Sequence, residues 1–336
     1  MGSFRIGLLG FAQGYYATNY LTYLSRLKET EIIGCCDFGM GDAYTLECAF
    51  TTAREFCNKL GAPLYHQAKD LLRCAPDAVL ICSETHEHAK HAAMAMEAGA
   101  DVFVAKPTAF IPEDIQQLQQ VAAKTGKKII SGQPLRYETG MKEIRDAIRG
   151  GRIGQVTHVR LLINHMAMIH QAWERDAKRS GGPLGTFGIY LFDVVNMLCG
   201  LRVCELFAYG NRLVFKQING PDTVQVAAVL DNGALAGLDL ISTMQWDSPF
   251  VQIQITGENG CIQGRYDNPT FILTKEAEID QGSLRTSDMG AGEMEYFLAC
   301  LRGETLAEPS LEEMLYITRG IQAIQTSINT GTRQCL

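Results

Sequence analysis

The first 133 residues alternate short apolar runs with segments of helical spacing. The apolar runs are the expected strands, at 4–10, 31–38, 77–83, 102–106 and 127–132. Helical patterns fill the segments 17–27, 44–59, 88–99 and 113–126. Short apolar strands that alternate with helices are typical of a parallel sheet covered on both faces. In such a sheet, ligands bind beyond the carboxyl ends of the strands.

A different pattern follows after about residue 150. Strand-like runs lie at 155–166, 203–210, 222–230, 234–243, 250–257 and 270–275, and several are joined by turn-like DNG or GENG segments. Strands at such short spacing predict an antiparallel sheet. Two helices, near 292–301 and 311–330, close the chain. The sequence therefore predicts an α/β protein, with a parallel-sheet domain over 1–133 and an α+β domain over 134–336.

One charged residue stands out at the predicted ligand edge. The apolar run VFVAK ends in Lys106, and Pro107 follows at once. Strands often end in a charge, so this position alone proves little. However, Lys106 ends a strand of the parallel sheet, where ligands bind. It is therefore a candidate site residue.

The first strand-to-helix turn carries a weak nucleotide-binding signal. In GLLGFAQGYY, Gly10 suits a tight turn and Ala12 is small enough for a pyrophosphate to approach. Tyr15 occupies the third position of the G-x-G-x-x-G pattern. The turn Gly10, Phe11, Ala12 and Gln13 is the predicted phosphate-binding segment, and a tight turn without a ligand is the alternative.

Asp37 strengthens the nucleotide interpretation because it ends the second strand. A carboxylate there can accept a hydrogen bond from the 2′-hydroxyl of an adenine ribose and would repel a 2′-phosphate. NAD is therefore expected rather than NADP. The alternative is an aspartate that caps the following turn.

Composition argues against several classes of function. The net charge is −7 and no basic run occurs, which argues against nucleic acid and anionic membranes as partners. No targeting segment and no apolar run of about 20 residues is recognisable. The 11 cysteines form no CxxC pair, which suits free thiols in a reducing cytoplasm. A cytoplasmic protein is therefore expected.

The order of several motifs resembles the glucose–fructose oxidoreductase / inositol dehydrogenase (Gfo/Idh/MocA) family across nearly the whole chain. After the nucleotide turn and Asp37 come SETHEHA, AKP, GQPLRY and GGPLGTFGIYLFD. The resemblance implies a Rossmann domain, followed by a substrate-binding and oligomerisation domain with a large, mostly antiparallel sheet. It also implies a nicotinamide cofactor and sugar or cyclitol substrates.

The resemblance assigns roles to particular residues. It makes Lys106 the catalytic lysine and Pro107 the residue that fixes the strand's exit. It places Ser83, Thr85 and His88 beside the cofactor. It also implies a strand that brings Gln133, Arg136 and Tyr137 to the site.

The last motif and its neighbours depart from the family pattern. In GGPLGTFGIYLFD, Gly188 and Asp193 match, whereas Thr186 stands at the usual Asp and Tyr190 at the usual His. Ala105 replaces the Glu before the lysine, and Ala12 replaces the second Gly. These departures leave the substrate class open.

Oxidation of an alcohol needs a hydride acceptor, which NAD supplies, and a group that takes the hydroxyl proton. We assign proton transfer to Tyr190 and polarisation of the oxygen to Lys106, with the reverse assignment open. Thr186 lies four residues before Tyr190 and shares its face if the segment is helical. Lowering the pKa of Tyr190 or of Lys106 to about 7 requires roughly 4 kcal/mol of differential interaction.

Further candidates for substrate contact are less constrained. His165 follows a strand, and His170, Trp173 and Arg175 lie in a segment expected to form a loop over the substrate. Aromatic and Arg side chains suit the faces and hydroxyls of a sugar ring. His86, His88 and His91 lack the spacing of a zinc helix, so no metal is expected.

Three functions remain open on this basis. The first is an NAD-dependent oxidoreductase acting on a ring carbon of a sugar, cyclitol or glycoside. The second is a redox-neutral enzyme that retains NAD, such as an epimerase, lyase or glycosidase. The third is a non-catalytic NAD-binding protein. The broad second sheet should expose an apolar face, which predicts a homodimer or homotetramer.

Overall fold

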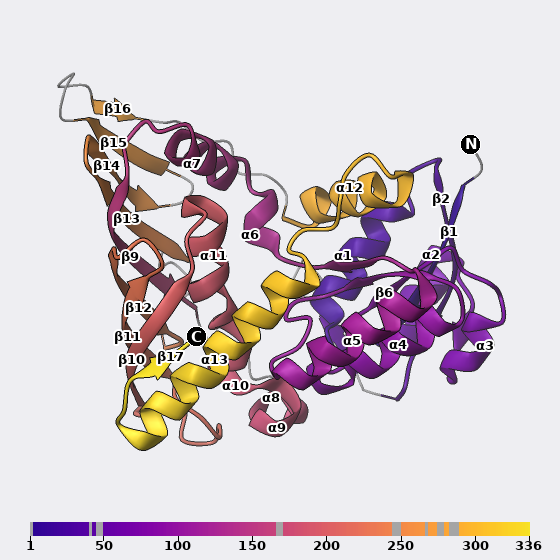
Figure 1. The fold of residues 1–336 in the computed structure, drawn as a ribbon. Coiled ribbons are helices and arrows are strands. Elements are labelled where there is room, and N and C mark those ends of the chain that lie inside the picture. The colour runs from indigo at the N-terminus through magenta and orange to yellow at the C-terminus, as the bar shows by residue number, and fades with distance from the viewer. Residues whose placement is uncertain are drawn as a thin grey trace. The chain divides into compact units, whose positions relative to one another are not determined.

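The chain folds into two compact units in the computed structural model (Figure 1). The structure describes residues 3–39, 42–44, 50–165, 171–243, 250–265, 268–273, 279–281 and 289–336. The first unit comprises Met1–Pro134 and Asp288–Leu315, and the second comprises Leu135–Ser287 and Tyr316–Leu336. Residues 288–315 therefore belong to the first unit although they follow the second sheet in the sequence.

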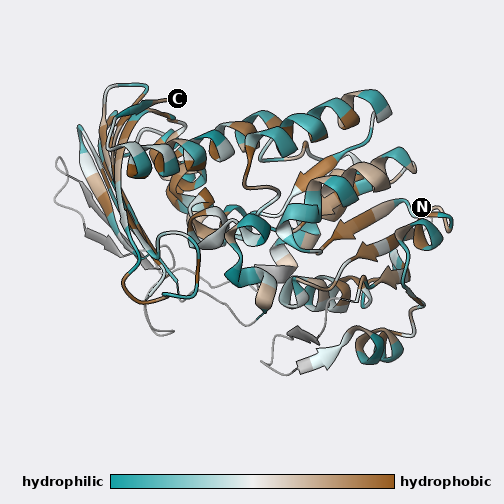
Figure 2. Ribbon diagram, turned by 90° about the horizontal axis from the view of Figure 1, so that it is seen from below, coloured by the Kyte–Doolittle hydropathy of each residue, from teal (hydrophilic) through white to brown (hydrophobic). Residues whose placement is uncertain are grey.

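A six-stranded parallel sheet forms the centre of the first unit. The strand order is β5-β2-β1-β6-β7-β8. The bounds are β1 Phe4–Leu9, β2 Thr30–Cys36, β5 Leu64–Tyr65, β6 Ala78–Ile81, β7 Asp101–Val104 and β8 Ile129–Ser131. The predicted parallel sheet is confirmed, and β5 is an additional strand at its edge. Figure 2 shows strands of this sheet as mostly hydrophobic, as expected when helices cover both faces.

Helices cover the two faces of this sheet (Figure 1). One face carries α1 Gly14–Leu24, α2 Ala53–Leu60 and α12 Met289–Arg302. The other carries α3 Ala68–Leu72, α4 His88–Glu97 and α5 Pro112–Thr125. The short helix η1, Thr85–Glu87, precedes α4. The carboxyl ends of the strands are thereby left to the loops that carry the candidate site residues.

The helix expected over residues 44–59 starts later than predicted. The structure has two short strands, β3 Asp42–Tyr44 and β4 Phe50–Thr52, before α2. Thr52 caps α2: its hydroxyl accepts from the backbone N–H of Glu55, and the Glu55 carboxylate accepts from the N–H of Thr52. This reciprocal capping box fixes the start of the helix.

An aromatic stack holds α1 and α12 against the sheet. Phe103 of β7 makes edge contacts with Tyr20 of α1 at 5.2 Å and with Phe297 of α12 at 5.6 Å between ring centroids. All three rings are fully buried. Aromatic edge contacts add to the gain from burial. Cys35 and Cys36 are buried free thiols, as expected.

The second unit is built on a mixed sheet with the order β16-β15-β14-β13-β9-β12-β11-β10-β17. Between its described strands, the β9–β12 pair is parallel and the remaining pairs are antiparallel. The bounds are β9 Val156–Asn164, β10 Val203–Asn211, β11 Thr223–Leu230, β12 Leu235–Ile241, β13 Val251–Gly257, β14 Gly260–Arg265, β15 Asn268–Leu273, β16 Ile279–Gln281 and β17 Gln334–Cys335. The mostly antiparallel sheet is confirmed.

Helices α7 Thr139–Arg149, α11 Ile189–Cys199 and α13 Leu311–Thr330 lie on one side of this sheet (Figure 1). Side chains that point to the other side include exposed apolar ones, with Tyr209 at 69% and Leu235 at 59% exposure. Three short helices precede α11: α8 Ala172–Arg175, α9 Ala177–Ser180 and α10 Gly182–Phe187.

Among the residues that the structure describes, one helical stretch, 177–199, has the length and hydropathy of a membrane span. However, 83% of its most apolar window is buried inside the structure, as in a core helix.

The segment GQPLRY differs from its predicted conformation. A strand was expected to carry Gln133, Arg136 and Tyr137, but β8 ends at Ser131 and residues Pro134–Tyr137 form the short helix α6. Proline cannot donate a ladder hydrogen bond but fits the first turn of a helix. The change of conformation at Pro134 follows from this preference.

We predict that Gly320→Ala destabilises the protein. A Cβ at Gly320 of α13 would lie 2.5 Å from two ring atoms of Phe192, which is fully buried on α11. Overpacking costs about 1–3 kcal/mol and outweighs the gain in helix propensity of roughly 1 kcal/mol. Urea denaturation measures the change. Gly237→Ala, where a Cβ meets nothing within 4 Å, is the control; equal stability of the two variants would contradict this packing argument.

Candidate functional site

The turn after β1 lies directly against the loop after β6. Gly10 has φ +89°, and a Cβ there would lie 2.5 Å from Cα of Ser83. The N–H of Gly10 donates to the carbonyl of Cys36, and the N–H of Gln13 donates to that of Cys82. Only glycine satisfies both the backbone angle and the close approach. The turn is thereby held across the ends of β2 and β6.

The next residues lead into α1. The Phe11 ring packs in the core against Phe56 at 6.2 Å, so any contact of Phe11 with a ligand uses its backbone. Ala12 is buried. Gln13 is the N-cap residue of α1, and no side chain caps the helix there. The first N–H groups of α1 thus suit an anion such as a pyrophosphate.

Gln13 also connects three loops of this edge. Its side-chain amide donates to the hydroxyl of Thr85 at 3.3 Å and to the carbonyl of Lys106 at 3.2 Å. These bonds bring together the loops after β1, β6 and β7. Three of the predicted cofactor-binding residues are therefore neighbours in the structure.

The loop after β2 carries Asp37 and Phe38. Asp37 is partly exposed, and its N–H donates to the carbonyl of Tyr65. The Phe38 ring stacks on His91 at 4.5 Å. Nδ1 of His91 lies 2.8 Å from the hydroxyl oxygen of Ser83. Burial lowers the pKa of His91 to about 4, so the ring is neutral at pH 7.

The imidazole of His88 connects the loops after β6 and β7. Its Nδ1 lies 2.9 Å from the carbonyl oxygen of Pro107, and its Nε2 lies 2.9 Å from that of Ser83. Burial lowers the pKa of the ring to about 4, so at pH 7 it is neutral and donates to one of the two oxygens. The side chain is fully buried. Any effect of His88 on a bound cofactor therefore acts through these loops.

Lys106 is a buried ammonium at the carboxyl end of β7. Only 6% of the residue is exposed. Burial lowers the pKa of Lys106 to about 7, and the charge of Glu293 opposes that shift. A lysine that titrates near neutrality can both hold a charge and accept a proton, which an ordinary surface lysine cannot do at pH 7.

Buried polar atoms without a hydrogen-bond partner gather at this edge. They include the side-chain oxygens of Gln13, Thr108, Ser131 and Gln133. Gln13 follows β1 and Thr108 follows β7, whereas Ser131 ends β8 and Gln133 follows it. Native proteins rarely leave buried polar atoms unpaired away from functional sites. Together with the open N-terminus of α1, this edge fits a polar cofactor with a pyrophosphate.

Two residues of this edge were not predicted from the sequence. Thr108 follows Pro107 and is fully buried, a position that the motif AKPT could have indicated. Glu293 comes from α12, far along the chain, and is 1% exposed. No local pattern connects Glu293 with Lys106, so only the fold reveals their electrostatic interaction.

Arg136 of α6 forms a buried ion pair in the second unit. Its guanidinium donates from Nη2 to Oδ1 of Asp193 at 2.7 Å and from Nε at 3.0 Å. The Asp193 side chain is fully buried. This geometry gives Arg136 a structural role between α6 and α11, and its predicted contact with substrate stays a prediction. Tyr137, its neighbour on α6, is buried as well.

A second group of predicted residues lies together in the second unit. His165 follows β9 and stacks on Phe187 at 4.0 Å. The ring of Phe250 makes edge contacts with His165 at 5.4 Å and with Tyr190 at 5.5 Å. Tyr190 is only 1% exposed. Two of the predicted residues, His165 and Tyr190, are thus joined through one aromatic cluster.

The segment before α11 holds the remaining candidates. The Thr186 hydroxyl donates to the carbonyl of Ser180 at 3.4 Å, near the end of α10. The Trp173 ring is buried and its indole N–H donates to the side chain of Gln171 at 2.9 Å. Arg175 is exposed on α8. His170 lies outside the described residues.

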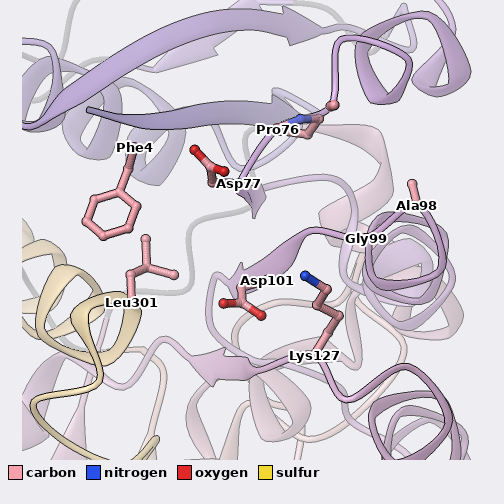
Figure 3. Close-up of a pocket in the computed structure, with 9 residues that line it drawn as sticks. Phe4, Pro76, Asp77, Ala98, Gly99, Asp101, Lys127 and Leu301 are labelled. Carbon is pink, nitrogen blue, oxygen red and sulfur yellow. The ribbon is translucent and has the colours of Figure 1, made fainter. Parts of the chain in front are cut away.

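A pocket of about 390 Å³ opens at the other end of the parallel strands. Figure 3 shows Asp77 and Asp101 projecting into it, with Phe4 and Leu301 on one side and Lys127 on the other. Both carboxylates already accept from backbone N–H groups, those of Arg5 and Lys128. This pocket lies at the amino ends of the strands, whereas ligands of such sheets bind at the carboxyl ends.

The histidines after β6 do not gather metal ligands. Nδ1 of His86 lies 3.3 Å from a carboxylate oxygen of Glu84, and its Nε2 lies 3.5 Å from one of Glu87. Within the described ranges, no three His, Cys, Asp or Glu side chains are placed to hold a metal ion.

Comparison with known families identifies the chain. Residues 4–133 match the oxidoreductase family with an NAD-binding Rossmann fold, and residues 141–263 match the GFO/IDH/MocA C-terminal domain. The chain belongs to the GFO/IDH/MocA oxidoreductase family. Its first unit therefore contains an NAD-binding Rossmann domain. In sheets of this type ligands bind at the carboxyl ends of the strands, the edge at which Gly10, Asp37 and Lys106 lie.

Two curated relatives indicate the range of this family. A D-glucoside 3-dehydrogenase of Escherichia coli K12 is 27% identical over 350 residues, which cover 98% of this chain and 96% of the relative. A myo-inositol 2-dehydrogenase of Thermotoga maritima is 27% identical over 237 residues, which cover 68% of this chain and 69% of the relative. The chain is similar to dehydrogenases of different sugar-like substrates.

Solved structures share the fold over the whole chain. An oxidoreductase domain protein from Kribbella flavida has a TM-score of 0.86 at 22% identity, covering 100% of this chain and 99% of that chain. An oxidoreductase from Agrobacterium radiobacter, in complex with NAD+, L-tartaric acid and magnesium, has a TM-score of 0.84 at 18% identity, covering 99% and 98%. At these identities, the likeness shows the fold alone.

We predict that the effect of Lys106→Met on stability depends on pH and is more favourable at pH 7 than at pH 9.5. The folded Lys106 titrates near pH 7 and an unperturbed lysine near 10.5. Between these values the unfolded chain binds more protons, so stability rises with pH in the wild type. The gain from Lys106→Met should therefore be larger at pH 7 than at pH 9.5, by on the order of 3 kcal/mol. Calorimetry measures it, with Lys124→Met at an exposed lysine as the control. A stability gain that does not depend on pH would contradict the low pKa of Lys106 in the folded protein.

Asp193→Asn should destabilise the protein by about 3–5 kcal/mol, because it removes the negative charge that Asp193 presents to the buried guanidinium of Arg136. Chemical denaturation at pH 7 measures the loss. Asp146→Asn is the matched control, since Asp146 pairs with Arg145 at the surface and such pairs contribute about 0–1 kcal/mol. Similar losses in the two variants would show that burial of the Arg136 pair does not matter.

Proposed function

We propose that the protein is an NAD-dependent oxidoreductase that transfers a hydride between the nicotinamide and a ring carbon of a sugar, cyclitol or glycoside. The observation that carries the proposal is a buried lysine with a pKa of about 7 at the carboxyl edge of an NAD-binding sheet. Alcohol oxidation requires a proton acceptor active near neutral pH, and Lys106 meets that requirement.

The burial and the low pKa of Lys106 favour it as the group that exchanges the hydroxyl proton. NAD, when bound, supplies the hydride acceptor. Lys106 in its neutral form takes the proton, and in its charged form it stabilises the oxygen. This is the reverse of the assignment that the sequence favours, and the low pKa of Lys106 is the reason. Tyr190 is proposed to donate a hydrogen bond from its hydroxyl to a substrate oxygen. The Thr186 hydroxyl, which donates to Ser180, is proposed to accept a hydrogen bond from a substrate hydroxyl.

The substrate class rests on the relatives and on the second unit's side chains. The relatives act on glucosides and inositol, by their names. His165, Trp173 and Arg175 are proposed to contact the substrate, since aromatic faces and Arg suit polyhydroxylated rings. NAD is proposed over NADP because Asp37 would repel a 2′-phosphate and the next residue, Phe38, is aromatic.

A homodimer or homotetramer remains a prediction. The exposed Tyr209 and Leu235 side chains point away from the helices of the second unit, on the face that a second copy would cover.

The proposal is tested by nicotinamide absorbance with NAD or NADP and a panel of alkyl glucosides, hexoses and inositols. Turnover with NAD and weaker or no turnover with NADP is expected. Lys106→Met should lower kcat/KM by about 10²–10⁴-fold because the proton acceptor is lost, while Lys124→Met should not change it. Full turnover in Lys106→Met would refute the assigned role. NAD that copurifies with the protein and never exchanges, without net reduction, would favour a redox-neutral reaction instead.

A further inference from the structure

We infer that Glu293 of α12 is the positioning residue that sets the charge of Lys106, and that Tyr20 of α1 holds the Glu293 carboxylate in place. The inference deepens the proposed function, because it concerns the lysine to which that function assigns the hydroxyl proton. It assigns a role to a residue outside every motif that the sequence offers around the site.

The core fixes where Glu293 points. Phe297, one helical turn after Glu293, packs edge-on against Phe103 of β7. Residues four apart on a helix share a face, so the packing that anchors Phe297 also turns Glu293 toward the sheet. Glu293 is 1% exposed.

Tyr20 fixes the carboxylate itself. Its hydroxyl donates to Oε2 of Glu293 at 2.7 Å, and the ring is fully buried. Burial and the charge of Glu293 raise the pKa of Tyr20 well above its usual value. Tyr20 therefore stays protonated and remains a donor, in a charge-assisted hydrogen bond of the stronger class.

The carboxylate lies beside Gly132, a residue hydrogen-bonded to the strand that leads to Lys106. A Cβ at Gly132, just after β8, would lie 3.2 Å from Oε1 of Glu293 and 3.0 Å from the carbonyl oxygen of Val104. The N–H of Gly132 donates to that same carbonyl at 2.7 Å. Val104 ends β7, two residues before Lys106. Glu293 is thus placed where β7 and β8 end.

The titratable groups that feel the charge of Glu293 include Tyr20 on α1, Cys82 after β6 and Lys106 after β7. Tyr20 and Cys82 are neutral near pH 7, because burial raises the pKa of each. Lys106 is the member of this group that gains from a nearby negative charge. Burial alone would push its proton off, and Glu293 opposes that loss.

The test measures the protonation of Lys106 directly in the full-length protein. Protein labelled with ¹³C at the lysine Cε is titrated by NMR, and the resonance that titrates near pH 7 is assigned by its loss in Lys106→Met. Glu293→Gln, which keeps the shape and still accepts from Tyr20, should lower the midpoint by about one pH unit or more. Glu293→Asp keeps the charge on a shorter stem, and a smaller decrease is expected.

The same two helices offer a matched control. The hydroxyl of Tyr23 on α1 donates to Glu295 on α12 at 3.0 Å, at the exposed surface. Glu295→Gln removes the same charge from the same helix and should leave the midpoint unchanged. An equal decrease in Glu295→Gln, or an unchanged midpoint in folded Glu293→Gln, would overturn the inference. If Glu293→Gln does not fold, an unchanged midpoint in Glu293→Asp would overturn it.

Kinetics adds an independent readout wherever a substrate is found. The acid limb of kcat/KM should move to lower pH in Glu293→Gln, by the same amount as the NMR midpoint. Because the NMR titration needs no turnover, it tests the role of Glu293 independently of the proposed function. A shifted midpoint in a protein without dehydrogenase activity would refute the proposed function and support the role of Glu293.

Discussion

The free energy of keeping one lysine ammonium out of water is the constraint on which the site depends. Lys106 is almost fully buried at the end of β7. Removing a charge from water costs several kcal/mol unless other groups compensate, and a lysine usually responds by losing its proton. In this protein, the opposing charge of Glu293 leaves the titration near neutrality. Burial and a counter-charge therefore act in opposite directions on the pKa of Lys106.

The aromatic core of the first unit makes this balance possible. Phe103 lies on the strand that ends near Lys106, and it contacts Tyr20 on one helix and Phe297 on another. The helix α12 belongs to a segment that returns to the first unit after the second sheet. The return brings the buried carboxylate of Glu293 to the cofactor-binding sheet. The same packing thus stabilises the fold and orients the charge.

Much of the fold follows from local patterns, and the exceptions have physical causes. Apolar runs predicted the parallel strands because both faces of that sheet are buried. The edge strand β5 has only two residues and leaves no such run. The late start of α2 depends on the Thr52–Glu55 capping box, which outweighs the helical spacing upstream. Strand order, including the parallel β9–β12 pair, depends on contacts between distant segments.

The candidate site, like the fold, could be predicted only in part from the sequence. The sequence predicted Gly10, Gln13, Ser83, Thr85 and Lys106 as one group, and the structure brings their loops together. It did not predict that His88 would lie beneath the loops or that Arg136 would pair with Asp193. Those side chains are polar and belong to motifs, so sequence reasoning places them at the ligand. Burial and partner geometry decide between a ligand contact and structural support, and neither can be deduced from the spacing of motifs.

The position of Glu293 changes what the departures from the family pattern imply about the site. Ala105 stands where the family has a glutamate before the lysine, which suggests a site without a carboxylate. However, electrostatic interaction depends on distance and burial and not on position in the sequence. Glu293 acts on Lys106 from another helix, so the loss of a motif carboxylate does not remove negative charge from the site. In the second unit, Tyr190 at the usual histidine packs in an aromatic cluster with Phe250. The proposed function assigns proton exchange to Lys106, whose pKa burial lowers to about 7.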